Sequence, residues 1–258
     1  MNRIEKKFSD LKAEGRKGLV GYLTAGDPDF DTSYKDVTAA IEGGIDVLEL
    51  GVPFSDPTAD GPTIQEASQR ALAGGMNVEG VLKMVRKIRE DHDIPIVLFG
   101  YANPFFKYGY ERVCEEALEA GADGMLVVDL PFEESGEMVE HMKPRGLEFI
   151  PLIAPTTPHD RAASVLSHAG GFVYYIMVTG VTGARQEVAG DIDSHVTDLR
   201  SCTELPIAVG FGVSNGEQAV KAAESADAVV VGSALIKAAR SGKLAELVAE
   251  IRAALDAS

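Results

Sequence analysis

The chain has 258 residues, of which 45% are hydrophobic, so it is long enough to bury the core of one α/β barrel or of two small domains. No Pro/Ser-rich linker divides it, and we expect a single domain over residues 1–258. The formal net charge of −16 disfavours nucleic acids and anionic membranes as partners, because those surfaces are themselves negative.

The first ten residues are charged and lack the apolar core of a signal peptide, and the longest apolar run, around 228–231, is too short to span a bilayer. We therefore expect a cytoplasmic protein. Cys114 and Cys202 lie in helical patterns and fit buried thiols in a reducing compartment better than a disulfide framework. The five histidines show no metal-ligand spacing, which disfavours a zinc site or a histidine-based triad.

A helix with Ile4, Phe8 and Leu11 on one face is expected first, followed by alternating strands and helices. Eight apolar runs bounded by turn residues are strand candidates: 19–25, 46–52, 94–101, 124–130, 149–154, 172–178, 206–211 and 228–233. This alternation predicts a parallel sheet, and eight repeats in about 250 residues predict a (β/α)8 barrel whose N-terminal end is closed by the first helix. A doubly wound open sheet is the alternative, although no GxGxxG follows the first strand.

Glu49 lies inside the second apolar run, where a charge is costly. Leu48, Leu50 and Val52 form the face expected to pack on helices, so Glu49 should point into the barrel. Burial favours the protonated carboxyl and should raise its pKa toward the range in which it can both give and take a proton.

Asp60 lies in the polar Gly/Pro-punctuated loop that follows, where its pKa has less reason to shift. Two carboxylates in such different environments suggest separate roles in catalysis. The structural alternative is a Glu49 bonded to backbone or to Arg inside the barrel, with Asp60 capping the helix after Gly61-Pro62.

In a barrel, the functional residues are expected at the C-terminal ends of the strands. The connection after the sixth strand, residues 179–194, is long and weakly apolar, which is typical of a mobile lid or, alternatively, of an ordinary surface loop. Glycine-containing segments follow the seventh strand at 210–214 and the eighth at 232–237, where barrels commonly bind phosphate through backbone N–H groups. Ser233 could add a hydroxyl to this phosphate site, and Gly183 in the connection after the sixth strand could close its third side.

None of the twelve lysines lies in an expected strand, which disfavours a lysine Schiff base. The chemistry that remains is metal-free acid/base catalysis by Glu49 and Asp60 on a small phosphate ester. The alternatives are another phosphate-binding barrel enzyme, such as an isomerase or epimerase of sugar phosphates or a ring-forming synthase, and a non-catalytic regulatory subunit.

The segment Glu49-Leu-Gly-Val-Pro-Phe-Ser-Asp-Pro-x-Ala-Asp-Gly-Pro-Thr-Ile-Gln65 resembles the signature of the tryptophan synthase alpha chain family. The likeness extends along nearly the whole chain, through 26–28, Tyr101-x-Asn103, 129–131, 180–183, 210–212 and Gly232-Ser233. It implies a (β/α)8 barrel that cleaves indole-3-glycerol phosphate to indole and glyceraldehyde 3-phosphate without a cofactor of its own. It also implies a beta-chain partner in an α2β2 heterotetramer, which carries pyridoxal phosphate and receives indole through a tunnel.

The resemblance also implies roles for individual residues. Glu49 would be the general acid/base, and Asp60 would bind the indole N–H and stabilise the charge that develops on the ring. Thr182 would orient Asp60 when the lid closes. The residues matching the substrate and phosphate contacts are Tyr22, Phe99, Leu126, Tyr174, Gly183, Phe211, Gly212, Gly232 and Ser233, and those matching the partner surface are Pro53, Phe54, Ser55 and Asp56.

The sequence departs from the family pattern in three places. Thr58 stands where Leu is usual, Tyr22 where Phe is common, and Met177-Val178-Thr179 replaces a Ser-Arg-Ser type sequence. None of them removes a catalytic group. The last means that the family's lid contacts and its communication with the beta chain do not carry over at these residues by resemblance alone.

Overall fold

The computed structural model describes residues 2–176, 187–210 and 212–258, with the backbone alone at 187–193. Its strands are β1 (Gly18–Thr24), β2 (Val47–Gly51), β3 (Ile96–Gly100), β4 (Gly124–Val127), β5 (Glu148–Phe149), β6 (Leu152–Ile153), β7 (Val173–Ile176), β8 (Ile207–Gly210) and β9 (Ala228–Val231). Its helices are α1 (Arg3–Glu14), α2 (Phe30–Gly43), α3 (Pro62–Ala73), α4 (Val78–Asp91), α5 (Ala102–Tyr108), α6 (Tyr110–Ala120), α7 (Phe132–Met142), the 3-10 turn η1 (Lys143–Arg145), α8 (His159–Leu166), α9 (Glu187–Arg200), α10 (Gly216–Ala223), α11 (Ser233–Arg240) and α12 (Leu244–Asp256).

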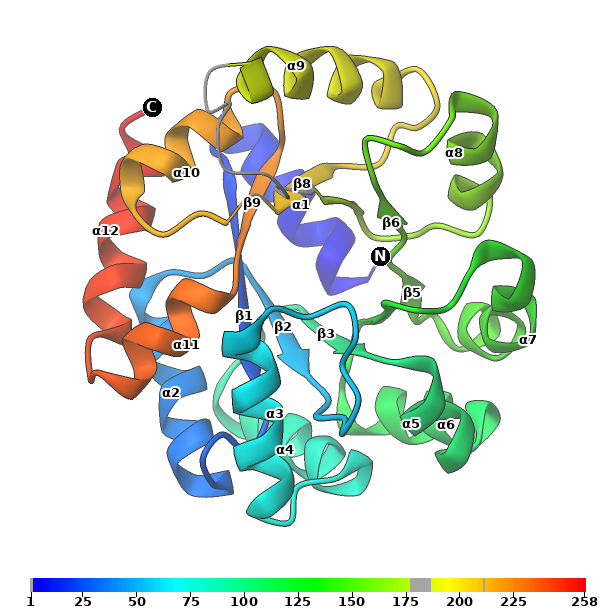
Figure 1. The fold of residues 1–258 in the computed structure, drawn as a ribbon, viewed down its shortest axis with the longest axis vertical. Helices are drawn as coiled ribbons and strands as arrows, with labels where there is room; N and C mark the ends of the chain where they lie inside the picture. The colour runs from blue at the N-terminus through cyan, green and yellow to red at the C-terminus, as the bar shows by residue number, and fades with distance from the viewer. Residues whose placement is uncertain (1, 177–186, 211) are drawn as a thin grey trace.

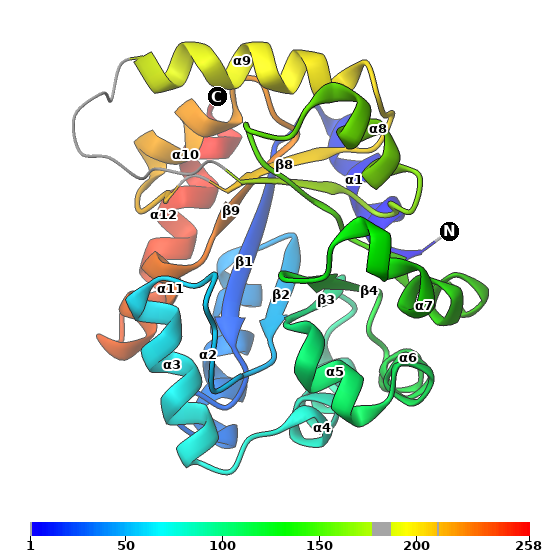
Figure 2. The same ribbon diagram turned by 45° about the vertical axis from the view of Figure 1, so that its right-hand side comes forward.

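The strands form one parallel sheet in the order β5-β4-β3-β2-β1-β9-β8-β7-β6. The first and last strands of the chain pair in its middle, with Val20 opposite Val230. Helices α2 to α12 surround the strands (Figure 1), as they do in a view turned by 45° (Figure 2). This is the ring of helices around a parallel sheet that the alternating sequence pattern predicts.

The fifth predicted strand, 149–154, is divided into β5 and β6 in the structure, and this division closes the barrel. Ile150 N–H donates to Met125 O of β4, and Pro151 O accepts from Tyr174 N–H of β7. This short segment therefore bonds to β4 on one side and to β7 on the other. Pro151 has no N–H to continue a ladder, so the strand changes partners at this residue. The barrel prediction is confirmed, and the open-sheet alternative is wrong.

Side chains alternate between the barrel interior and the surrounding helices. Val20, Val47 and Val97 belong to an interior cluster that also contains the three apolar residues of α1. Ile4 is fully buried, and the ring of Phe8 lies 5.5 Å from that of Phe172. The predicted N-terminal helix is confirmed, and it covers the N-terminal end of the barrel.

The helical patterns in the sequence are also confirmed, with one exception. Cys114 is buried in α6, as expected, and both cysteines are free. Cys202 is half-exposed in the turn after α9 rather than buried in a helix, because that helix ends at Arg200. Among the residues that the structure describes, none of the helices combines the length and the apolar character needed to cross a membrane.

Candidate active site

Glu49 lies in the middle of β2 and points into the barrel, as the alternation predicts. Its neighbours Leu48 and Leu50 pack outward in the helix-facing core, while Val47 joins the interior cluster. Glu49 is fully buried, and burial raises the pKa of its carboxyl to about 8. Neither carboxyl oxygen has a hydrogen-bond partner among the described residues, so the bonded structural alternative finds no support there.

Asp60 is held at the mouth of the barrel by a hydrogen bond from another loop. Tyr101 Oη, directly after β3, donates to Asp60 Oδ2 at 2.9 Å and accepts from Ala59 N–H at 3.1 Å. Burial raises the pKa of Asp60, while the Tyr101 hydroxyl acts in the opposite direction. Asp60 is less buried than Glu49 and has this opposing hydrogen bond, so the expectation that its pKa has less reason to shift than that of Glu49 is confirmed, although the loop buries it enough to raise the value.

The helix-capping alternative for Asp60 is wrong. The N-cap of α3 is Gly61, which has no side chain, and Pro62 occupies the first turn. The backbone carbonyl of Asp60 accepts from Gln65 Nε2 at 2.9 Å, which fixes the loop. The Asp60 side chain therefore bonds to Tyr101 and does not cap the helix.

An aromatic and apolar wall lies in the same part of the barrel. The rings of Tyr22 and Phe99 meet edge to face with centroids 5.0 Å apart, and Leu126 is paired with Phe99 in the adjacent strand. Tyr174 is inward-facing on β7, and burial, together with the charges of Glu49 and Asp60, raises its pKa well above the usual value. The structure thus brings together four predicted substrate-binding residues and both carboxylates.

The sequence motif that contains Tyr101 gave no reason to assign a role to its hydroxyl, and the structure provides one. A second loop contact supports it: Asp129 Oδ1, after β4, accepts from Ala102 N–H at the start of α5. The loops after β2, β3 and β4 are thereby joined by side-chain hydrogen bonds. The signal in the sequence that could have indicated this role was a polar aromatic residue at the C-terminal end of a strand.

The N-terminus of α11 is open toward the end of β9. Gly232 is its N-cap and provides no side-chain capping bond, so the first N–H groups of the helix remain available for an anion. Gly212, after the neighbouring strand β8, has φ +62°, a left-handed conformation that favours glycine. A Cβ on Gly232 would lie 3.5 Å from Tyr22 Cβ, so this end adjoins the aromatic wall.

Several predicted positions cannot be placed. Thr182, Gly183 and Phe211 lie outside the described residues, as do the departures at 177–179. Of the predicted lid, 187–194 belongs to helix α9, so the prediction of a loop over those residues is wrong. Their sequence contains Gly190, which favours a loop, but the helix forms across it.

The predicted partner segment differs in exposure from residue to residue. Pro53 is buried even without a partner chain. The ring of Phe54 packs on that of Tyr101, with the centroids 5.4 Å apart. Ser55 and Asp56 are exposed, as is the departure Thr58. Phe106 on α5 is 65% exposed, which is high for a large apolar side chain.

Within the described part of the chain, no group of three or more His, Cys, Asp or Glu side chains is arranged to hold a metal ion. The described strands also contain no lysine; Lys107 and Lys237 lie in helices α5 and α11. The groups that the described site offers for chemistry are two carboxylates, tyrosine hydroxyls and an open helix N-terminus.

Comparisons with known proteins agree on one family. The family model described as "Tryptophan synthase alpha chain" matches residues 8–256. The tryptophan synthase alpha chain of Citrifermentans bemidjiense is 50% identical over 251 residues, covering 97% of this chain and 94% of the relative.

Solved structures show the same likeness. Tryptophan synthase subunit alpha from Legionella pneumophila superposes with a TM-score of 0.92 at 38% identity, covering 100% of both chains. A tryptophan synthase structure from M. tuberculosis, in an open form, has a TM-score of 0.91 at 33% identity and covers 99% of both chains.

Proposed function

Because the chain belongs to the tryptophan synthase alpha chain family, we propose that Glu49 and Asp60 are the residues with which it carries out the family's reaction. The chain is a lyase that cleaves indole-3-glycerol phosphate to indole and glyceraldehyde 3-phosphate by a retro-aldol step. The observation that carries the assignment is the fully buried carboxyl of Glu49, whose pKa of about 8 lies near neutrality. The test is indole release by the purified chain and its Glu49→Gln variant.

Glu49 begins the cycle protonated and donates its proton to indole C3. The resulting carboxylate then takes the proton of the glycerol hydroxyl next to the ring. The bond between the ring and the glycerol carbon breaks, its electron pair returns to the ring, and the hydroxyl carbon becomes the aldehyde. Glu49 ends the cycle protonated again, so one carboxyl serves as both acid and base.

Asp60 stabilises the positive charge that spreads to the ring nitrogen when C3 is protonated, by accepting the indole N–H. Its hydrogen bond with Tyr101 holds the carboxylate in place before the substrate binds, so little reorganisation is needed during the reaction. This assigns different roles to the two carboxylates: Glu49 moves protons and Asp60 stabilises charge.

The remaining site residues bind the two ends of the substrate. The indole ring lies between Tyr22, Phe99 and Leu126, and Tyr174 lies near the glycerol phosphate. The phosphate is bound by the N–H groups of Gly212, Gly232 and Ser233, and the open N-terminus of α11 supports this assignment. By resemblance, Gly183 and Phe211 complete the phosphate site, and Thr182 orients Asp60.

The pH profile should report the acid form of Glu49. Because the cycle starts with the protonated carboxyl, and its pKa is about 8, kcat/KM should fall about tenfold per pH unit above that value. Below it, the proton is already in place and this group causes no loss. Steady-state assays of indole release between pH 6 and pH 10 provide the measurement. A rise in kcat/KM through pH 8 would mean that the ionised form starts the reaction.

Tyr101→Phe should lower kcat/KM by about tenfold, the equivalent of ~1.4 kcal/mol for one hydrogen bond to a charged group. The pKa of Asp60 should rise, because the hydroxyl that lowers it is lost, and the acidic limb of the profile should move to higher pH. Tyr108→Phe is the matched control, since its hydroxyl also donates to a carboxylate, that of Glu116. Equal activity in both variants would exclude the proposed role of Tyr101.

The family relationship implies a beta-chain partner, and we assign the contact to the loop with Phe54, Ser55 and Asp56 and to the exposed Phe106 of α5. Pro53 supports that loop from inside. The assembly is an α2β2 heterotetramer in which the partner holds pyridoxal phosphate and receives indole. A single domain over 1–258 and a cytoplasmic location complete the proposal; the pairing of β1 with β9 and the two free thiols support them.

Adding a beta chain from a close relative should raise the rate of indole release, because docking near Asp60 favours closure of the site. Asp56→Lys should weaken this activation and leave the rate of the chain alone unchanged. Asp31→Lys, on the exposed first turn of α2, serves as the control. Titration of activity with the beta chain gives both values. Activation of Asp56→Lys equal to that of the parent would exclude this surface.

A further inference from the structure

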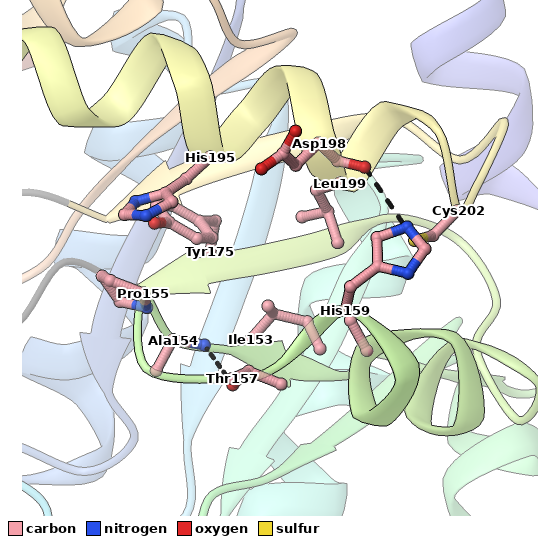
Figure 3. A pocket seen from close by; sticks show the side chains of 11 residues that line it. Ile153, Ala154, Pro155, Thr157, His159, Tyr175, His195, Asp198, Leu199 and Cys202 are labelled. Atoms are coloured by element: carbon pink, nitrogen blue, oxygen red, sulfur yellow. Dashed lines mark hydrogen bonds between the residues drawn. The ribbon is translucent and has the colours of Figure 1, made fainter.

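A cysteine and a histidine meet between α8 and α9 (Figure 3). Cys202 Sγ lies 3.1 Å from His159 Nε2, although the two residues are 43 positions apart. Cys202 is half-buried, and the His159 side chain is 62% exposed. The sulfur is therefore within reach of small molecules.

The pair stands at one end of a cavity of about 70 Å³ that lies between the two helices. Ile153, Ala162 and Leu199 give the cavity an apolar lining, and His195 lies at its opposite end beside Tyr175 (Figure 3). The space admits a short chain of atoms next to the sulfur and excludes a folded partner.

The surrounding groups can accommodate a proton on His159. Ser201 Oγ lies 3.2 Å from the same Nε2 and donates its own proton to Asp198 O at 2.6 Å. Its oxygen can therefore accept from the Nε2–H that forms when His159 becomes protonated. Asp160 Oδ1 lies 3.9 Å from Nδ1. The thiol proton can thus move from Sγ to Nε2, leaving a thiolate beside an imidazolium with acceptors on both sides.

We propose that Cys202 and His159 form a thiol–imidazole pair that exchanges with small disulfides, producing a mixed disulfide on Cys202. A thiolate, and not a thiol, attacks sulfur, and a neighbouring histidine is the usual means of producing one. This site lies outside the residues assigned to the lyase reaction, and it does not depend on them.

The exchange is balanced within the pair and one disulfide molecule. His159 Nε2 takes the proton of Sγ, and Sγ attacks one sulfur of the disulfide. The new S–S bond forms as the old one breaks, and its electron pair leaves on the second sulfur. That thiolate takes the proton from the imidazolium and departs as a thiol, so no further oxidant is needed.

The charges around the pair select the kind of disulfide. Asp160 and Asp198 flank the two residues, and the whole chain carries a formal net charge of −16. A cationic disulfide is attracted to this region and an anionic one is repelled. The class of ligand is therefore a small amine-bearing disulfide, for which cystamine is the probe.

The experiment measures incorporation of cystamine into the full chain by intact mass and peptide mapping at neutral pH. Cys114 is an internal reference, because it is buried and its thiol pKa is raised to about 11. We expect one cysteamine on Cys202, none on Cys114, and release by dithiothreitol. Cystamine should react with Cys202 faster than with the model thiol N-acetylcysteine amide. When the rate of each disulfide with Cys202 is divided by its rate with the model thiol, oxidised glutathione should react more slowly than cystamine.

Variants separate a paired thiol from a merely accessible one. His159→Gln should slow the reaction at Cys202 by about tenfold, whereas His195→Gln, in the same cavity, should leave the rate unchanged. Cys202→Ser should abolish incorporation. A Cys202 rate that equals the model thiol and does not change in His159→Gln would overturn the proposal, as would equal labelling of Cys114.

Discussion

Glu49→Gln is expected to lower the rate of indole release at saturating substrate by roughly 10³-fold. Glutamine preserves the size of the side chain but can neither give C3 a proton nor take one from the glycerol hydroxyl. The substrate KM should change little, because the slot and the phosphate site are intact. The measurement is indole formation from indole-3-glycerol phosphate by the purified chain.

The same substitution should stabilise the fold, which separates lost chemistry from lost structure. In the folded chain the pKa of Glu49 is about 8 against 4.5 for the free group, so the unfolded chain releases this proton first as pH rises. The contribution of this proton to the parent's free energy of unfolding is fully present below pH 4.5. It is lost progressively as the pH rises to 8 and does not change further above that value. Glutamine does not titrate, and the variant should gain stability over this window, by on the order of 5 kcal/mol at most.

Urea unfolding of the parent and the variant at several pH values measures this difference. Glu42→Gln, an exposed carboxyl on α2, is the control and should leave activity unchanged. A Glu49→Gln variant that retains parental activity would exclude Glu49 as the proton carrier. A Glu49→Gln variant less stable than the parent at pH 8 would contradict the burial of the Glu49 carboxyl without a hydrogen-bond partner.

Asp60→Asn is expected to reduce kcat by roughly 10²- to 10³-fold, the size of effect seen when one preorganised electrostatic group is removed. The amide can still accept the Tyr101 hydroxyl bond, so the loop should stay in place. The negative charge that stabilises the protonated indole ring is lost. The loss should therefore fall mainly on kcat, since that charge acts on the transition state.

Steady-state kinetics of Asp60→Asn and of Asp31→Asn, an exposed carboxylate on α2, give the comparison. An unchanged kcat with a higher KM would assign Asp60 to substrate binding alone. Adding Tyr101→Phe to Asp60→Asn should slow the reaction by less than Tyr101→Phe does in the parent. The reason is that the two residues act through one hydrogen bond.

The sequence predicted those features that depend on local pattern. Alternation around Leu48 and Leu50 was sufficient to place Glu49 in the interior, and its raised pKa follows from that position alone. The spacing of Ile4 and Phe8 predicted the helix that covers the barrel end. These are short-range signals, and the fold preserves them.

Features that depend on distant residues could not be predicted in this way. The pKa of Asp60 depends on burial by its loop and on Tyr101, 41 positions away. Strand 149–154 is divided because Pro151 changes partners between β4 and β7, which is a property of the closed sheet. The contact between Cys202 and His159 likewise exists only after α8 and α9 pack together.

The most direct test of the central claim is an infrared difference titration of the parent against Glu49→Gln. The proposed cycle requires that Glu49 carry a proton at pH 7 and lose it near pH 8. The parent should therefore show, at neutral pH, one carboxylic acid C=O band that the variant lacks, and this band should disappear with a midpoint close to 8. A Glu49 band that is already absent at pH 6 would show an ionised carboxylate and contradict the account.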